Sequence, residues 1–192
     1  SSDLDTCPSG LQCIAGLCRS RADDPSAPPA LDMAMVPTPT PVKGCTGDGT
    51  LLASVAGKLA VACAGVFTSG SAASLCAAGY HPCKNSDSAL LADARASGRC
   101  DDSRLEGFFA ADVSAGYDAG NAFVCSPTGT VTTHVLVGCG IESGARVLNP
   151  PCQELTTAAA CDGSVSGWSC TSGFATAAHA AGTVGGVLCC QN

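Results

Sequence analysis

The chain has 192 residues, enough for one sizeable domain and an appendage, and it carries a net charge of −7 with only 13% charged residues. This acidic balance excludes the basic surface that nucleic-acid-binding proteins use. Residues 163–192 carry no charge, but their many Gly, Ser and Thr residues argue against a membrane-spanning helix. Aromatic residues make up only 4% of the chain, which predicts a thin core.

Fifteen cysteines in this length are typical of a disulfide scaffold formed in an oxidising compartment. The chain begins at Ser1 rather than Met, which fits a secreted protein whose signal peptide has been removed. We therefore expect an extracellular or cell-surface location, with disulfides supplying part of the stability that the thin core lacks.

Residues 1–18 are expected to form a short Cys-rich arm, in which Cys7, Cys13 and Cys18 follow a C-x5-C-x4-C spacing. Zinc knuckles use a C-x2-C spacing that the arm lacks, so the pattern favours disulfide bonds over metal binding. We expect no cofactor here or elsewhere in the chain.

Residues 19–44 are rich in proline and lack a sustained apolar period, which predicts an extended, semi-rigid linker of polyproline II type. Thr38 and Thr40 lie between prolines, as in O-glycosylated stalks, and both are candidate glycosylation sites. A bare tether is the alternative interpretation.

The main domain, residues 45–192, opens with a predicted strand region followed by a helix. The segment 51–63 indicates a strand or a hairpin-like pair. The segment 85–98 predicts a helix that Ser86 or Asp87 caps. Its apolar face consists of Leu90, Leu91 and Ala94.

The rest of the domain predicts short elements in mixed order. Strands are expected over 107–116, 121–125, 130–139, 167–170 and 185–190, and helices over 152–161 and 175–182. Because helices and strands do not alternate strictly, the expected fold class is α+β: a disulfide-rich single domain with a mainly antiparallel sheet and a few short helices.

The cysteines divide unevenly between arm and domain. Three lie in the arm, so one of them is left over unless it bonds to a domain cysteine and leaves another unpaired. The leftover cysteine is expected to form an inter-subunit disulfide or to stay a free thiol, and the alternative is a partner lost upstream of Ser1. In a strand, successive side chains face opposite sides, so Cys189 and Cys190 should take different partners. The twelve domain cysteines can pair completely: Cys45, Cys63, Cys76, Cys83, Cys100, Cys125, Cys139, Cys152, Cys161, Cys170, Cys189 and Cys190.

The sequence shows no catalytic constellation. The three histidines lack metal-binding spacing: His81 is expected in a disulfide-braced loop, His134 on a strand and His179 in an Ala-rich helix. No G-x-S-x-G elbow and no P-loop occur. Among so many cysteines, Cys139 is expected to be disulfide-bonded rather than reactive. We therefore expect a protein that is not an enzyme.

Asp101, Asp102 and Glu106 form the densest acidic cluster. Two interpretations fit it: a calcium site built from loop oxygens, and a solvated loop with Arg99 and Arg104 as counter-charges. The spacing matches no EF-hand loop, so no metal ligand is assigned.

Charge is scarce in the second half of the domain, where the 74 residues from 119 to 192 include only four charged side chains: Glu142, Arg146, Glu154 and Asp162. Designed soluble surfaces carry about a quarter charged residues or more. Three interpretations fit: a surface buried against other subunits, a flat polar face for sugars or cell-wall polymer, and a secreted protein of generally low charge.

Two stretches resemble secreted bacterial proteins. The arm "CPSGLQCIAGLC", followed by "DMAMVPTPTP", resembles the N-termini of Cys-rich secreted proteins and lipoproteins of myxobacteria and their relatives. The motifs "LCAAGYHPC", "GFFAA", "GCG", "WSC" and "GGVLCC", spread over most of residues 76–190, resemble a Cys-rich extracellular module that follows such linkers. Its element order is loosely similar to that of C-type-lectin-like domains. Their E-P-N, Q-P-D and W-N-D signatures are absent, so the resemblance does not imply calcium-dependent sugar binding.

We therefore expect an extracellular structural subunit that self-assembles into a filament or surface layer through its arm, linker and charge-poor face. Its partners would be further copies of the chain, with no nucleic acid and no transmembrane segment involved. The alternative is a lectin-like cell-surface module for glycan binding and adhesion. Its candidate sugar platforms would be Tyr80, Tyr117 and Trp168, although a Trp close to a cysteine, such as Trp168 near Cys170, is more often a core residue.

Overall fold

The computed structural model describes residues 11–14, 17–20, 43–101, 105–117, 120, 123–125, 133–142, 144–147, 152 and 154–192. The chain divides into two compact units, residues 1–40 and 41–192, and each is described by itself.

The first unit contains a β-hairpin in its described part. Strands β1 (Leu11–Ile14) and β2 (Leu17–Ser20) pair antiparallel, and Cys13 lies opposite Cys18 in the register. Cys7, Thr38 and Thr40 lie outside the described residues, so the disulfide and glycosylation sites expected there stay predictions.

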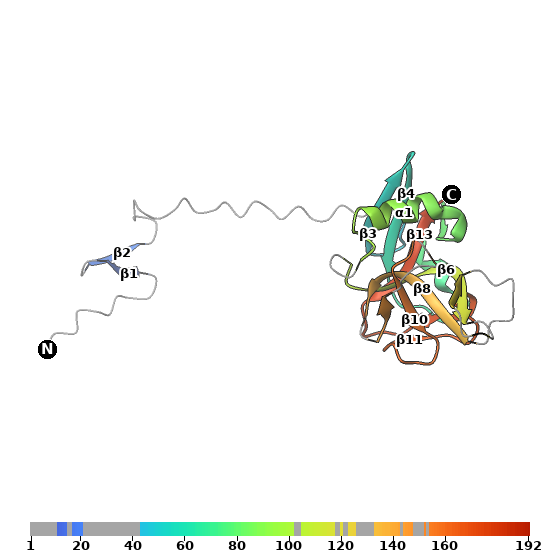
Figure 1. Ribbon diagram of the computed structural model, residues 1–192. Coiled ribbons are helices and arrows are strands. Elements are labelled where there is room, and N and C mark those ends of the chain that lie inside the picture. Colours follow the sequence, from blue (N-terminus) through green and yellow to red (C-terminus); the bar gives the residue numbers. More distant parts are fainter. Residues whose placement is uncertain are drawn as a thin grey trace. The chain divides into compact units, whose positions relative to one another are not determined.

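The second unit is built on one large mixed sheet (Figure 1), with the strand order β3-β4-β13-β6-β8-β10-β9. In addition, β5 pairs with β13 and β7 with β6. The neighbours β13 and β6 run parallel, and the other pairs are antiparallel. The strands are β3 (Gly49–Val55), β4 (Lys58–Ala64), β5 (Tyr80–Pro82), β6 (Gly107–Tyr117), β7 (Phe123–Cys125), β8 (Thr133–Ile141), β9 (Arg146–Val147), β10 (Thr157–Ala160) and β13 (Gly185–Gln191).

Of the two possibilities expected over 51–63, a strand or a hairpin-like pair, the structure contains the hairpin. Strands β3 and β4 are joined by a two-residue turn in which Ala56 and Gly57 both have positive φ, 50° and 81°. Two central residues with positive φ match the twist of the flanking strands, which is why such turns are common in tight hairpins.

The central strands are buried on both faces, and their side chains alternate between two cores. We call the cluster that includes α1 the helix-side core and the cluster that includes Trp168 the Trp-side core. In β13, Val187 lies in the Trp-side core and Leu188 in the helix-side core. Residues 135–140 and 185–190 are all buried. Burial inside the domain therefore accounts for the scarcity of charge over these strands without a neighbouring subunit.

One face of the sheet is covered by a helix, as expected over 85–98. A 3-10 turn η3 (Asn85–Asp87) leads into α1 (Ser88–Ala96), which packs on β3 and β4. Asp87 occupies the position before α1, but its side chain does not cap that helix and instead accepts a hydrogen bond of 2.7 Å from the Lys84 amide. The apolar face is the expected one, with Leu90, Leu91 and Ala94 buried.

The other face is covered by short segments, and two helices expected from the sequence are wrong. The range 152–161 contains β10, which lies between β8 and β9 in the sheet. The range 175–182 contains β12 (Ala178–His179), preceded by the 3-10 turn η4 (Phe174–Thr176). Alanine favours helices, but pairing with neighbouring strands overrides that weak preference. The remaining elements on this side are β11 (Trp168–Ser169), which pairs with β12, and the 3-10 turn η2 (Ala72–Leu75).

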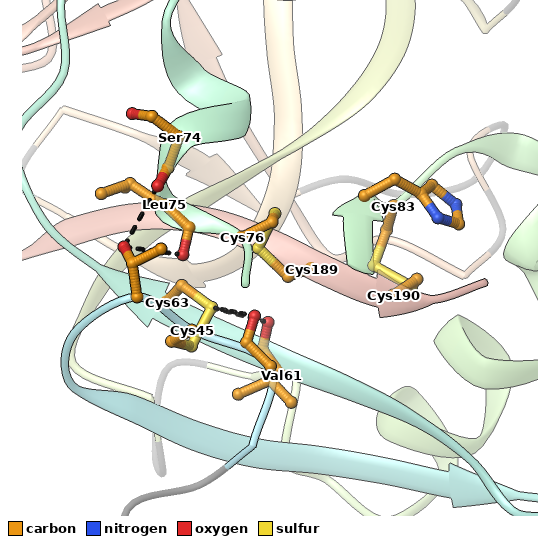
Figure 2. The surroundings of a disulfide bond; sticks show 12 residues. Cys45, Val61, Cys63, Ser74, Leu75, Cys76, Cys83, Cys189 and Cys190 are labelled. Atoms are coloured by element: carbon orange, nitrogen blue, oxygen red, sulfur yellow. Dashed lines mark hydrogen bonds between the residues drawn. A yellow bond between two sulfur atoms is a disulfide. The ribbon is translucent and has the colours of Figure 1, made fainter. Parts of the chain in front are cut away.

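Six disulfides bind the second unit together. Adjacent bridges fasten β13 (Figure 2): Cys189, in the Trp-side core, pairs with Cys76, and Cys190, in the helix-side core, pairs with Cys83. These are different partners on opposite faces, as strand alternation predicts. The other pairs are Cys45–Cys63, Cys100–Cys139, Cys125–Cys152 and Cys161–Cys170.

The described part of this unit is thus mostly sheet, with one short α-helix and a dense set of disulfides, as expected for a small disulfide-rich domain. Such bridges form in oxidising compartments. Over the residues that the structure describes, no helix is long and apolar enough to cross a membrane.

Candidate functional site

The candidate site lies where the chain leaves the main sheet after β4. The Gly65 amide donates a 3.0 Å hydrogen bond to the Gly185 carbonyl, which extends the β4–β13 pairing by one residue. The chain then diverges, and Phe67 exchanges two backbone hydrogen bonds of 3.0 and 2.9 Å with His179 of β12. Since β12 also pairs with β11, three short segments form a small sheet over the Trp-side core.

The side chains of this small sheet alternate between core and surface. Phe67, Trp168 and His179 are buried, with 6%, 2% and 2% of their surfaces exposed. The residues next to them in sequence are exposed or half-buried: Val66, Thr68, Ser169, Ala178 and Ala180. Because these outer residues are small, the outer face of the small sheet is hollow rather than filled.

This hollow is a groove with a volume of about 580 Å³. It lies between the small sheet and the turn before η2, and it is lined by residues 66–69, 71, 74, 167, 169 and 178–180. Among the described residues that line it, five carry side-chain hydroxyl groups and none is Asp, Glu, Lys or Arg. The groove therefore offers hydrogen-bonding groups and apolar surface without charge.

His179 forms part of the groove's base, and both of its ring nitrogens have partners. Nδ1 lies 2.8 Å from the Gly65 carbonyl oxygen, and Nε2 lies 2.8 Å from Oγ1 of Thr183. A carbonyl can only accept, so Nδ1 donates, and in the neutral ring Nε2 accepts from the Thr183 hydroxyl. The imidazole thus joins β12 to the end of β4 and to the loop before β13.

Trp168 lies beneath the groove in an aromatic cluster. Its ring centroid is 4.5 Å from that of His179, 5.1 Å from that of Phe108 and 5.7 Å from that of Phe67. Its indole N–H donates a 3.1 Å hydrogen bond to the Glu142 carboxylate. Of the two interpretations of Trp168, core residue and exposed sugar platform, the structure bears out the first, because its ring completes the core and its polar atom is already paired.

Gly167 holds the β11 side of the groove in a conformation that favours glycine. Its φ is +77°, and a Cβ atom there would collide with the hydroxyl of Thr183, the hydrogen-bonding partner of His179. A larger residue would thus disturb both the backbone and the imidazole contact below the groove.

The opposite wall is organised by Thr68 and Ser71. The Ser71 hydroxyl donates to the Thr68 carbonyl at 2.8 Å and accepts from the Thr68 amide at 3.0 Å. The two hydroxyl oxygens are also 3.1 Å apart. Since the Ser71 proton is already used, Thr68 must donate in this contact, which leaves its Oγ1 lone pairs as hydrogen-bond acceptors for a ligand.

A second polar cluster involves His81, which lies on β5 rather than in a loop. Its Nε2 is 3.0 Å from the Asp87 carboxylate, and its Nδ1 is 2.6 Å from the side-chain oxygen of Asn192. A histidine beside a carboxylate resembles part of a catalytic dyad, but here the second nitrogen is also held. The arrangement joins β5, η3 and the end of β13, and the described contacts place no nucleophile on the ring.

The remaining sequence-based candidates lie apart from the groove. Cys139 is bonded to Cys100, as expected, and is no reactive thiol. Asp102 lies outside the described residues, and the described part of the chain contains no group of three or more His, Cys, Asp or Glu that could hold a metal. Tyr80 is half-buried on β5, away from the groove lining. The side chains of Tyr117 and His134 lie outside the described part.

Sequence reasoning missed the groove. Its lining comes from segments 66–74, 167–169 and 178–180, of which the last was expected to be helical. The pairing of Phe67 with His179, which joins these segments, has no signature in the sequence. A comparison with known protein families, curated proteins and solved structures finds no match for this chain.

Proposed function

We propose that this chain is an extracellular binding module that holds a small ligand in the groove and is not an enzyme. The observation that carries the proposal is the groove itself, a hollow of about 580 Å³ beside a buried aromatic cluster. Small-molecule sites have volumes of about 300–1,000 Å³ and combine apolar surface with a few placed polar groups. The groove has both properties.

The walls of the groove are held in place before any ligand arrives. The Cys161–Cys170 bridge closes the loop that carries Gly167 and Ser169. On the other side, the Cys76–Cys189 bridge ties the end of η2 to β13. A site that is already ordered loses little conformational entropy on binding, so a modest set of contacts suffices for affinity.

The chemistry of the lining supports binding rather than catalysis. General acid–base catalysis requires a titratable group within reach of the substrate proton. In the part of the lining that the structure describes, the one titratable side chain is His179, which is buried and has partners on both ring nitrogens. Within the described lining, no carboxylate or free imidazole accompanies the hydroxyls as a general base that would activate a nucleophile.

The test fills the groove without touching the core. Ala180 is exposed in the lining, so Ala180→Trp should occupy the hollow, whereas Ala92→Trp, on the exposed side of α1, is the matched control. A library of small saccharides, short peptides and organic acids is screened against the full chain by ligand-observed NMR. We expect at least one compound to bind the wild type and the control. The same compound should bind Ala180→Trp with an affinity at least about tenfold lower. A library without any such compound would overturn the proposal.

Self-assembly is the second candidate, and cysteine parity favours it. Fifteen cysteines minus the twelve that pair within the second unit leave three in the arm, an odd number. At most two of the three can pair with each other, and a disulfide to a second copy of the chain would use the third. The arm also belongs to a unit separate from the main domain, which suits an extension that reaches a neighbour.

Negative-stain electron microscopy of the native secreted material, with and without reductant, tests this second candidate. Regular filaments or sheets that shed subunits under reductant are the expected result. Dispersed single particles at high concentration, together with a monomeric band on a non-reducing gel, would contradict it.

A further inference from the structure

We infer that the ligand of the groove is an uncharged saccharide, an inference that rests on the proposed function and specifies its ligand class. Charge is the first reason. The described lining contains no Asp, Glu, Lys or Arg, so a charged ligand would lose its hydration there without gaining an opposite charge. The net charge of −7 further disfavours anions such as sulfated or uronic-acid sugars.

The backbone around the groove does not suit a peptide ligand. Extended peptides bind to a sheet edge through main-chain hydrogen bonds. At Phe67, both backbone groups face β12 and bond to His179. At Thr68, the next position along this edge, the amide bonds to the Ser71 hydroxyl and the carbonyl accepts from both the Ser71 amide and hydroxyl. The backbone groups of Thr68 that would pair with an added strand are thus already used.

On the opposite side of the groove, several backbone groups likewise already have hydrogen-bond partners. The Gly167 carbonyl accepts a 2.8 Å hydrogen bond from the Ala180 amide. Beyond β11, the amides of Thr171 and Ser172 both donate to the Thr176 hydroxyl, at 2.9 and 2.8 Å. Recognition therefore falls to side chains, and the polar side chains of the lining, apart from His179, are hydroxyls.

Those hydroxyls offer complementary roles to sugar hydroxyls. Thr68 presents an oriented acceptor, because its proton is used by Ser71. Within the described part of the chain, the hydroxyls of Ser69, Ser74 and Ser169 form no hydrogen bond, so each can donate and accept. A saccharide hydroxyl likewise donates one bond and accepts others, which matches this mixed set.

The apolar part of the groove suits the C–H faces of a sugar ring. Ala178 and Ala180 line it with methyl groups, and Val66, 56% exposed, adds a larger apolar side chain. Phe67 belongs to the lining but is only 6% exposed, and Trp168 is buried below, so the ligand contacts mainly aliphatic surface and hydroxyls rather than an exposed aromatic ring. This composition distinguishes the groove from a stacking platform.

The experiment compares ligand classes on the full chain. Isothermal titration calorimetry measures binding of neutral oligosaccharides of glucose, galactose, mannose and N-acetylglucosamine, of uronic-acid and sulfated oligosaccharides, and of neutral tetrapeptides. We expect at least one neutral oligosaccharide to bind, with an affinity that hardly changes with salt because no charges are paired. Thr68→Val should weaken it about tenfold by removing the acceptor, and Thr68→Ser should restore it.

The outcomes separate this inference from the proposed function. If a peptide or a charged saccharide binds in a manner that Ala180→Trp abolishes and Ala92→Trp preserves, the groove is a binding site but the ligand class is wrong. If a neutral saccharide binds equally well to wild type and Ala180→Trp, the saccharide site lies elsewhere and the inference fails. If nothing sensitive to Ala180→Trp binds, both the inference and the proposed function fail.

Discussion

The two faces of the main sheet are covered in different ways, and the difference explains why one of them carries a groove. On the helix-side face, α1 places long aliphatic side chains against the sheet, with Leu90 and Leu91 packed beside Leu52. On the Trp-side face, the cover is a small sheet with aromatic rings inward and mostly small residues outward. Figure 1 shows α1 over β3 and β4, and β11 near β8 and β10.

A helix and a small sheet leave different outer surfaces. The outer side of α1 carries charged residues such as Asp93 and Arg95, as expected for a solvated helix face. The outer side of the small sheet carries the small residues Ala178, Ala180 and Ser169. They lie between larger neighbouring parts of the lining, so a hollow remains. The same sheet thus supports one face specialised for stability and another on which a ligand can lie.

The largest expected effect concerns the adjacent disulfides, one for each face. Replacing the cysteines of either Cys76–Cys189 or Cys83–Cys190 by Ala should cost about 2–3 kcal/mol, because the other bridge still restrains the long loop. Replacing all four should cost about 7 kcal/mol, more than the sum, because a loop of over a hundred residues then opens. Guanidinium unfolding measures both. Strictly additive losses would show that the bridges do not share this loop restraint.

A core substitution on the helix side should separate stability from binding. Leu91 is 2% exposed, and Leu91→Ala should lower the free energy of unfolding by about 3 kcal/mol by leaving a cavity under α1. Ligand affinity at the groove should stay within about twofold, because the groove lies on the opposite face. Calorimetry below the unfolding transition checks this. A parallel loss of affinity would contradict the independence of the two faces.

The smallest expected effect tests the glycine under the groove against a matched glycine nearby. Gly163 and Gly167 have φ values of +80° and +77°, but only at Gly167 would a Cβ meet other atoms. Gly163→Ala should cost about 1 kcal/mol of backbone strain, and Gly167→Ala about 1–2 kcal/mol more by displacing Thr183. Thermal unfolding compares the two variants. Equal losses would show that the Thr183 contact with His179 contributes little.

The sequence indicates the helix-side face better than the Trp-side face, and the reason is the range of the interactions. Leu90, Leu91 and Ala94 repeat at helical spacing within one segment, so local periodicity predicts α1. The alternation of Cys189 and Cys190 likewise depends only on a strand's period of two. Both features are local, and both are found in the structure.

The groove depends on contacts between distant segments, which a single sequence does not encode locally. His179 lies in an Ala-rich stretch whose composition favours a helix, but backbone bonds to Phe67 and pairing with β11 make it a strand. The scarcity of charge after residue 119 is also ambiguous from sequence. Strands buried on both faces, exposed interfaces and polar binding surfaces all deplete charge, and only the fold distinguishes them.

The most direct test of the central claim is amide chemical-shift mapping by NMR on the isotopically labelled full chain, titrated with the neutral oligosaccharide that binds most tightly. The account predicts shifts confined to residues 66–74, 167–169 and 178–180, with the amides of α1 unchanged. Shifts centred on α1 or on the β3 edge, with the groove amides unmoved, would contradict it.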